Sequence, residues 1–297
     1  MVSGVIVKAL SGFYYVRVDG EQETVECKGS GKLRHKGMSP LVGDRVLISK
    51  DSAGKGRIEE VQPRTNSFIR PAVANIEALI CVTSDAIPVT DTYLVDRLSV
   101  TAVHNHCKVI IAINKVDIVR TERMIEIYEA SGFPVIACSA ETGEGIEELR
   151  QAVAGKICAF TGDSGVGKSS ILNSLNPAFS LRVGDVSNKL GRGRHTTRHV
   201  ELFDLGNGTY LIDTPGFASF DMEAVDPIMC GDLQYAFPEF EPYLDGCRFN
   251  DCAHLKEPDC AVRNAVRDGK IHKKRYQSYK MMYADASKYK HWEMKNK

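Results

Sequence analysis

The sequence predicts a multidomain chain: a small N-terminal β-barrel, a central α/β domain and a C-terminal α-helical domain. Three changes along the chain lead to this fold class. Short strand-like segments fill the first 60 or so residues, and apolar strand-length runs alternate with helix-like stretches from about residue 68. Pro, Cys, Asp and Gly then dominate from about residue 220 to Cys260, before helices resume. We therefore predict domains over residues 1–65, 66–221 and 222–297.

The N-terminal domain is predicted from short segments rich in Val, Ile and Tyr, separated by Gly, Ser, Asp and Pro. With no long helix between them, this pattern fits an OB-type β-barrel, and an SH3-like barrel would give much the same pattern. The predicted strands are Val2–Lys8, Gly12–Val18, Thr24–Lys28, Asp44–Lys50 and Gly56–Val61.

The central domain alternates strands and helices, which predicts a mostly parallel sheet with helices on both faces. Its last two strands flank Gly206-Asn207-Gly208, which is typical of a hairpin turn. The predicted strands are Ala78–Val82, Lys108–Ile113, Pro134–Cys138, Lys156–Thr161, Val200–Leu205 and Tyr210–Ile212, and the predicted helices are Tyr93–Asn105, Thr121–Ser131 and Gly145–Val153.

Composition limits the function classes. The chain has 297 residues, of which 43% are hydrophobic, and no apolar run approaches the ~18 residues that a membrane span needs. The first residues lack the pattern of a secretory signal, so we expect a cytoplasmic protein without a membrane partner. Although the net charge is zero, residues 247–297 carry 13 basic and 6 acidic residues. This basic end is expected to meet a polyanion such as nucleic acid.

A glycine-rich segment matches the phosphate-binding pattern G-x-x-x-x-G-K-[ST]. It follows the predicted strand Lys156–Thr161 and precedes the helix-like Ser170–Leu175, which is the context that the pattern needs. Backbone N–H groups would point at phosphate oxygens, Lys168 would act on the β- and γ-phosphates, and the Ser169 hydroxyl would bind Mg²⁺. The predicted contacts are Gly162, Asp163, Ser164, Gly165, Val166, Gly167, Lys168, Ser169 and Ser170.

Two further elements predict that the bound base is guanine. Residues 114–117 have the N-K-x-D pattern of a guanine-binding loop and follow a strand. Guanine carries an N2 amino donor beside its N1–H, so the carboxylate of Asp117 can accept from both. Asn114 is expected to brace the loop and Lys115 to lie along the base. After another strand, Ser139 and Ala140 resemble the short S-A element that backs the base.

The γ-phosphate and Mg²⁺ are expected to meet two segments after the phosphate loop. Residues 213–216 resemble the D-x-x-G element, in which Asp213 would hold Mg²⁺ through water and the Gly216 N–H would contact the γ-phosphate. Residues 191–198 are glycine-rich, basic and threonine-bearing, as a mobile switch loop requires. Thr196 or Thr197 would complete the Mg²⁺ shell. The spacing does not choose between them, and we favour Thr197.

Three cysteines and one histidine within fourteen residues predict a metal site near the C-terminus. The spacing is Cys247-x₄-Cys252-x-His254-x₅-Cys260. Four such ligands suit tetrahedral Zn²⁺ and leave no open position for catalysis, so the site is expected to be structural. Cys230 lies outside this spacing and is not counted as a ligand.

The order of these elements along the chain is unusual. In an ordinary GTPase the phosphate loop comes first, whereas here N-K-x-D precedes it and D-x-x-G comes last. This order is a circular permutation, which can leave the sheet unchanged because chain termini often lie close together. The N-terminal barrel, the permuted domain with its GRGRHTT loop and the zinc segment together resemble the RsgA/YjeQ family of bacterial small-subunit assembly GTPases.

This resemblance implies a GTPase that binds the small (30S) ribosomal subunit and its 16S rRNA late in subunit assembly, with hydrolysis stimulated by the subunit. The implied cofactors are GTP/GDP, Mg²⁺ and one structural Zn²⁺. It implies a cytoplasmic location and no DNA partner, and we expect a monomer because no long self-complementary helix is present.

Hydrolysis needs a group that orients the attacking water. Phe217 stands where many GTPases place a glutamine, so unstimulated turnover should be slow. His195, in the predicted switch loop, is the candidate catalytic residue within the chain, because an imidazole can orient or deprotonate water. The family resemblance points to the same histidine. Arg192, Arg194 and Arg198 could instead supply positive charge or contact RNA.

The C-terminal basic residues are interleaved with tyrosines. Tyr276, Tyr279 and Tyr283 recur at i, i+3 and i+7, which is also the pattern of a helix face packed on its own protein. We therefore expect core packing for the tyrosines and RNA contacts for the basic side chains, on opposite helix faces. The basic residues are Lys273, Lys274, Arg275, Lys280, Lys288 and Lys290.

Two other functions fit parts of this pattern. The chain could be a GTP-regulated RNA-binding module acting on another structured RNA. It could also be a P-loop kinase of a small molecule, although N-K-x-D and the glycine–threonine switch segment argue against a kinase.

Overall fold

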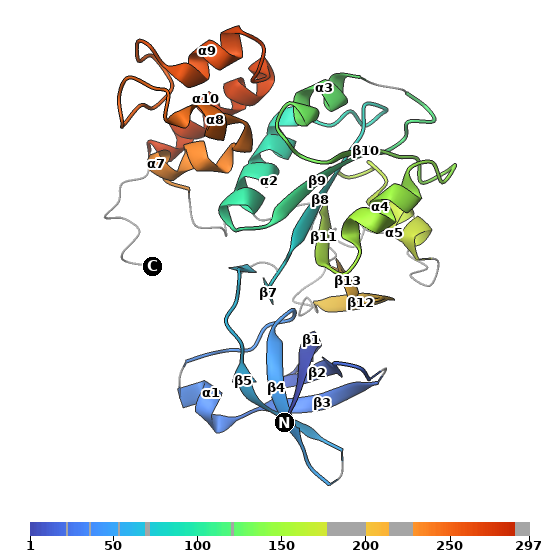
Figure 1. The fold of residues 1–297 in the computed structure, drawn as a ribbon. Coiled ribbons are helices and arrows are strands. Elements are labelled where there is room, and N and C mark those ends of the chain that lie inside the picture. The colour runs from blue at the N-terminus through green and yellow to red at the C-terminus, as the bar shows by residue number, and fades with distance from the viewer. Residues whose placement is uncertain are drawn as a thin grey trace.

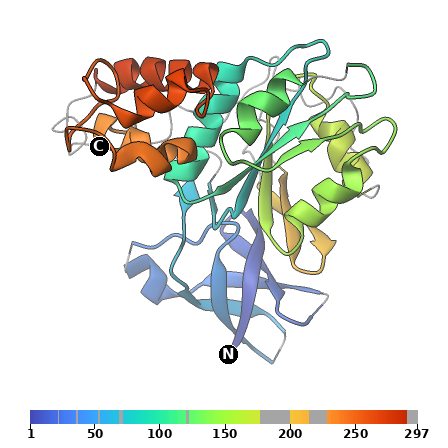
Figure 2. The same ribbon diagram turned by 45° about the horizontal axis from the view of Figure 1, so that its top comes forward.

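The computed structural model describes residues 1–21, 23–35, 37–52, 54–68, 72–119, 122–176, 200–213 and 228–288. A small barrel, a central sheet flanked by helices and a C-terminal group of helices follow one another along the chain, and α2 lies between the sheet and the C-terminal helices (Figures 1 and 2). None of the helices in the described part is long and apolar enough to cross a membrane.

The N-terminal part is an OB-type barrel, as predicted. Neighbouring strands follow the order β1-β2-β3-β5-β4, and β4 pairs back with β1 to close the barrel. β3 and β5 run parallel, the other pairs are antiparallel, and the short helix α1 lies between β3 and β4. The elements are β1 (Val2–Leu10), β2 (Phe13–Val18), β3 (Thr24–Gly29), α1 (Gly31–His35), β4 (Arg45–Lys50) and β5 (Gly56–Val61).

Two short strands that the sequence analysis did not predict, β6 (Ser67–Phe68) and β7 (Val73–Ala74), connect the barrel to the central domain. They form a hairpin that also bridges to the barrel through Val42 and Val73.

The central domain is the predicted α/β layer structure. Its strands follow the order β10-β9-β8-β11-β13-β12, and all pairs are parallel except β12–β13. Alternate residues of a strand face opposite sides of a sheet. In β8, Leu79 and Cys81 accordingly join the core under α2 and α3, while Ile80 and Val82 join the core under α4 and α5.

The element bounds agree with the predicted ones to within one or two residues. The strands are β8 (Ala78–Thr83), β9 (Lys108–Ile113), β10 (Val135–Ala137), β11 (Ile157–Thr161), β12 (Glu201–Gly206) and β13 (Thr209–Asp213), and the helices are α2 (Thr92–His104), α3 (Arg123–Glu129), α4 (Ile146–Val153) and α5 (Lys168–Leu175).

The barrel and the central sheet are joined edge to edge. β1 pairs antiparallel with β12 at Lys8 and Glu201, so the described strands other than β6 and β7 form one eleven-stranded sheet. The same two residues form an ion pair at 2.8 Å, and Arg17 of the neighbouring strand β2 lies 3.4 Å from Asp204 of β12. This joint was not predicted, because nothing in either segment marks the other as its partner.

The C-terminal part is a compact set of short helices with its own apolar core. Tyr279 is buried at its centre, stacked edge-on against Phe237 and Phe240, which confirms core packing for the tyrosine face of the last helix. The elements are α7 (Cys230–Leu233), η4 (Gln234–Ala236), η5 (Pro238–Phe240), α8 (Glu241–Leu244), α9 (Ala261–Arg267) and α10 (Lys273–Ala286).

The predicted role of Arg275 as an RNA contact is wrong. Its side chain is fully buried, and its guanidinium donates to Asp96 Oδ1 at 2.8 Å and to Glu239 Oε1 at 2.7 Å. It also donates to Ser99 Oγ at 3.0 Å. Asp96 and Ser99 belong to α2, so Arg275 attaches the C-terminal domain to the central one. The other cations of α10 that were predicted, Lys273, Lys274 and Lys280, are exposed.

Candidate functional site

One edge of the central sheet collects the elements that the sequence predicts for nucleotide binding. Parallel strands end at the same edge of a sheet, and ligands of such sheets bind outside these carboxyl ends. Asn114 directly follows β9, Cys138-Ser139 follows β10 and Gly162 follows β11, while Asp213 is the last residue of β13. Segments spread over a hundred residues of chain therefore lie close together at this edge. The circular permutation changes their order along the chain but not their place in the sheet.

The phosphate loop connects β11 to α5. Gly162 has φ +141°, and a Cβ there would overlap the carbonyl oxygen of Val82. Gly167 has φ +97°, and a Cβ there would overlap the side-chain amide of Asn114. Only glycine fits these two positions without strain, because the backbone has a left-handed conformation and close neighbours. The glycines at these two positions therefore allow the loop to adopt this shape.

Lys168 folds over this loop. Its ammonium group donates to the carbonyl oxygens of Gly162 and Asp163, both at 2.7 Å. Burial lowers the pKa of Lys168 to about 8, although the charge of Asp163 acts in the opposite direction. The side chain is thus a partly desolvated cation placed within the loop that is predicted to hold phosphates.

Asn114 links the three segments of the site. Its side-chain amide donates to the carbonyl of Val166 in the phosphate loop at 2.8 Å, and its amide oxygen accepts from the backbone N–H of Ala140 at 3.1 Å. The residue is buried, so these bonds hold the loop positions firmly. The predicted bracing of the loops by Asn114 is confirmed.

Lys115 and Asp117 lie beside this brace. Lys115 has a positive φ of 67°, and its ammonium group donates to the carbonyl of Ile87 at 2.9 Å. Asp117 is exposed, which is compatible with the base contact predicted for its carboxylate. Ser139 is fully buried, and its hydroxyl accepts from Thr142 N–H to shape the turn that presents Ala140.

Four predicted site residues, His195, Thr196, Thr197 and Gly216, lie outside the described residues. Asp213 is described only as the last residue of β13.

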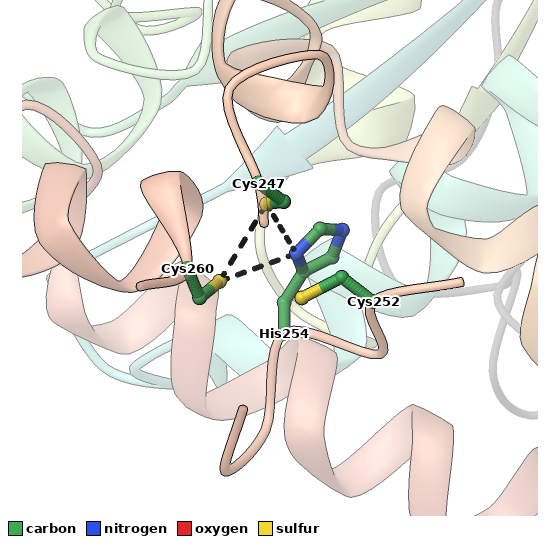
Figure 3. A group of neighbouring side chains, drawn as sticks. All are labelled: Cys247, Cys252, His254 and Cys260. Carbon is green, nitrogen blue, oxygen red and sulfur yellow. Dashed lines mark hydrogen bonds between the residues drawn. The ribbon is translucent and has the colours of Figure 1, made fainter. Parts of the chain in front are cut away.

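The second candidate site is the Cys₃His cluster of the C-terminal domain (Figure 3). One ligand atom from each of Cys247, Cys252, His254 and Cys260 lies within 4.8 Å of the others. The Sγ atoms of Cys247 and Cys260 are 3.9 Å apart, and His254 Nδ1 is 3.5 Å and 3.4 Å from them. Tetrahedral Zn²⁺ bonds of ~2.3 Å to sulfur and ~2.0 Å to nitrogen give edges of about 3.8 Å and 3.5 Å. The spacing therefore fits Zn²⁺, and Cys230 is not part of this cluster.

Neighbouring groups hold the ligands in this arrangement. His254 Nε2 lies 2.7 Å from the amide oxygen of Gln234, which fixes the proton on Nε2 and leaves Nδ1 free to bind a metal. The Cys260 sulfur accepts from the N–H of Arg263 and so caps α9. Glu257 accepts from the backbone N–H groups of Ala253, Leu255 and Lys256, which shapes the turn between His254 and Cys260.

Comparison with known proteins gives matches over nearly the whole chain. Residues 61–223 match the family described as RsgA GTPase, and residues 3–58 match the RsgA N-terminal domain. The chain belongs to the RsgA GTPase family. Proteins named small ribosomal subunit biogenesis GTPase RsgA are similar over almost their whole length. The one from Alkaliphilus metalliredigens is 40% identical, covering 97% of this chain and 99% of its own, and that from Geobacillus kaustophilus is 42% identical, covering 96% and 97%.

Two solved structures share the fold. YjeQ from Thermotoga maritima has a TM-score of 0.82 at 34% identity, covering 97% of this chain and 99% of its own. YloQ, described as a circularly permuted GTPase, has a TM-score of 0.81 at 34% identity, covering 98% and 96%. The protein is therefore a GTP hydrolase with the permuted order that the sequence predicts.

Two features of this RsgA-family GTPase were missed by the sequence analysis. The loop between β8 and α2 lies against the phosphate loop, because a Cβ on Gly165 would come within 3.3 Å of Pro88. The second feature is Gln234, which holds His254 by a hydrogen bond. It lies thirteen residues before Cys247, so the spacing of the metal ligands does not predict its role. The loop after β8 could have been predicted from the order of the strands. β8 lies between the parallel strands β9 and β11, so its carboxyl end and the loop that follows face the nucleotide edge as well.

Proposed function

We propose that this GTPase binds the small ribosomal subunit and its 16S rRNA and hydrolyses GTP to GDP and phosphate late in subunit assembly, with turnover stimulated by the subunit. The observation that carries the proposal is the single sheet edge where Asn114 ties the phosphate loop to the Ser139-Ala140 element. The small-subunit partner is supported by the names of relatives that match over nearly the full chain.

In this proposal, each part of the edge has a separate task. Backbone N–H groups of residues 162–170 surround the phosphates, and Lys168 leaves its loop carbonyls to neutralise the β- and γ-phosphates. Asp117 accepts from guanine N1–H and N2, with Lys115 along the base and Ser139-Ala140 behind it. Asp117→Asn should therefore move the preference from guanine toward xanthine, which a small-molecule kinase with a different base pocket would not show.

Mg²⁺ and the attacking water complete the proposed chemistry. The Ser169 and Thr197 hydroxyls, with Thr196 as the other candidate, and Asp213 through water are the residues that would hold Mg²⁺. The bound Mg²⁺ would neutralise charge on the phosphate oxygens. Gly216 N–H would contact the γ-phosphate and His195 would orient water for in-line attack. The assignments outside the phosphate loop are supported by the sequence patterns alone.

The Cys₃His cluster is proposed to bind one structural Zn²⁺. Its sulfur and nitrogen donors, its spacing and the hydrogen bond from Gln234 support this metal. A closed four-ligand site would crosslink the segment 247–260, which has few apolar residues of its own.

We further propose that the domains are 1–65, 66–221 and 222–297, and that the protein acts as a monomer in the cytoplasm with no DNA or membrane partner. The exposed lysines of α10 and the barrel are the surfaces expected to meet rRNA.

The proposal is tested by measuring GTP hydrolysis with and without purified small subunits, for the wild type and His195→Ala. Strong stimulation by small subunits, and not by large subunits, is expected, and its loss in the variant would place catalysis on His195. Equal GTP binding by both proteins is the control for folding. Hydrolysis that small subunits leave unchanged would reject the ribosomal proposal and favour a module acting on another structured RNA.

A further inference from the structure

A groove of about 700 Å³ opens on the C-terminal domain beside the metal cluster. Its walls come from the end of α2, from η4, η5 and α8, and from the loop that holds Cys247, Cys252 and His254. Pockets of this size are typical of ligand sites rather than of packing defects. The GTPase reaction uses none of these walls.

The groove is acidic although the chain from residue 247 onward is basic. Among the described residues, its charged lining side chains are Glu241 and Asp245, both exposed. Neither forms an ion pair within the described part of the chain. Residues 228–246 carry four acidic residues and no basic one, whereas residues 247–297 carry 13 basic and 6 acidic residues. The groove side and the α10 side of the domain therefore suit partners of opposite charge.

Exposed aromatic rings stand at the same groove. Tyr235 is 66% exposed and Phe249 is 41% exposed, and both line it together with the apolar side chain of Leu244. The guanidinium of Arg248 already lies 5.5 Å from the centre of the Phe249 ring. Aromatic faces next to carboxylates are a good environment for Lys and Arg side chains, because cation–π contacts and ion pairs act on the same cation.

We propose that this groove binds an extended Lys- and Arg-rich protein segment, and that the segment is carried by a protein of the small ribosomal subunit. The assignment of the segment to a protein of the small subunit rests on the proposed function. RNA is disfavoured as the occupant because its phosphates would face Glu241 and Asp245, the carboxylates that line the groove. The domain then uses two faces, with the lysines of α10 for RNA and this groove for a basic protein segment.

The first experiment measures binding of a fluorescently labelled, nine-residue Arg- and Lys-rich peptide to the full-length, zinc-loaded protein by anisotropy. The double variant Glu241→Lys/Asp245→Lys should weaken binding by about tenfold, since it replaces two attractive charges with repulsive ones. The control variant Glu129→Lys/Asp268→Lys makes the same charge change at two exposed carboxylates that do not line the groove, and should change binding less than about twofold. Equal losses in the two variants, or no peptide binding by the wild type, would overturn the proposal.

The second experiment places a photoreactive benzophenone amino acid at Tyr235 and irradiates the protein with small subunits. Co-sedimentation is measured on the same sample, so failure to bind the subunit is distinguished from failure of the groove. A crosslink to a ribosomal protein, lost in Glu241→Lys/Asp245→Lys, is the expected result. Crosslinks to RNA only, or none from a protein that co-sediments, would reject the groove as a protein site. If the protein does not co-sediment with small subunits, a ribosomal protein is rejected as the carrier of the segment. The peptide titration then decides by itself whether the groove binds a Lys- and Arg-rich segment.

Discussion

The environment of Lys168 couples nucleotide binding to pH. Burial lowers its pKa to about 8, so the neutral amine becomes the main form above that pH, whereas a bound triphosphate favours the ammonium form. Binding then takes up a proton, and the affinity for GTP should fall as pH rises. With a pKa of about 8, the expected loss between pH 7 and pH 8.5 is about fourfold.

This loss can be measured by titrating a fluorescent GTP analogue across the pH range. Lys168→Arg is the matched control, because a guanidinium stays charged at all these pH values. Its affinity should be independent of pH, whatever its absolute value. If both proteins show the same slope, another group is responsible for the pH dependence.

Gln234 offers a second test at the scale of single residues. Its amide oxygen lies 2.7 Å from His254 Nε2 and thereby directs Nδ1 toward the cluster. Gln234→Leu keeps the approximate volume but removes the acceptor, and should lower Zn²⁺ affinity by about 10- to 100-fold. Competition with a chromophoric chelator measures this affinity, and Gln277→Leu, at an exposed position of α10, is the control. Unchanged affinity would mean that the hydrogen bond from His254 to Gln234 does not contribute to metal binding.

At the scale of elements, α2 is the support of the C-terminal domain. Arg275 is fully buried between Asp96 of α2 and Glu239 of η5. The centre of the Phe237 ring lies 4.7 Å from the central carbon of its guanidinium. Removing the cation leaves two carboxylates buried together. Arg275→Met should therefore reduce the free energy of unfolding by about 3–5 kcal/mol.

Urea denaturation measures this effect, with Arg267→Met as the control because the Arg267 side chain is 74% exposed. The control should stay within about 0.5 kcal/mol of the wild type. A loss of similar size in both variants would show that Arg275 contributes no more than a surface cation. Loss of the zinc cluster in Arg275→Met alone would show that α2 also supports the metal site.

What the sequence could predict follows from how local each signal is. The strands and the phosphate loop were found because side-chain periodicity and the glycines of residues 162–167 act within a few residues. Cys247 to Cys260 were found because metal ligands leave a short, dense spacing. Arg275 was misplaced because its partner Asp96 lies 179 residues away, and helix periodicity does not tell whether a charge meets solvent or a buried carboxylate.

At the scale of the whole molecule, both flanking domains are attached to the GTPase domain by charged contacts, and the two attachments differ in how deeply these contacts are buried. The C-terminal domain uses a buried network on α2, whereas the barrel uses one strand pair and two partly exposed ion pairs on β12. β12 runs antiparallel to β13, which ends at Asp213 on the nucleotide edge. The barrel is therefore one strand away from the proposed Mg²⁺ site, at the joint with the more exposed ion pairs.

The barrel joint should respond to charge and salt. Lys8 and Glu201 are 33% and 41% exposed, so their ion pair is expected to contribute only about 0.2–1 kcal/mol and to weaken as salt screens it. Lys8→Glu should destabilise the protein by about that amount, and Lys8→Glu/Glu201→Lys should restore it, because the reversed pair is again attractive. Urea denaturation of the wild type, both single variants and the double variant at low and high salt gives the coupling energy. Losses that simply add in the double variant would show that Lys8 and Glu201 do not stabilise the joint through their ion pair.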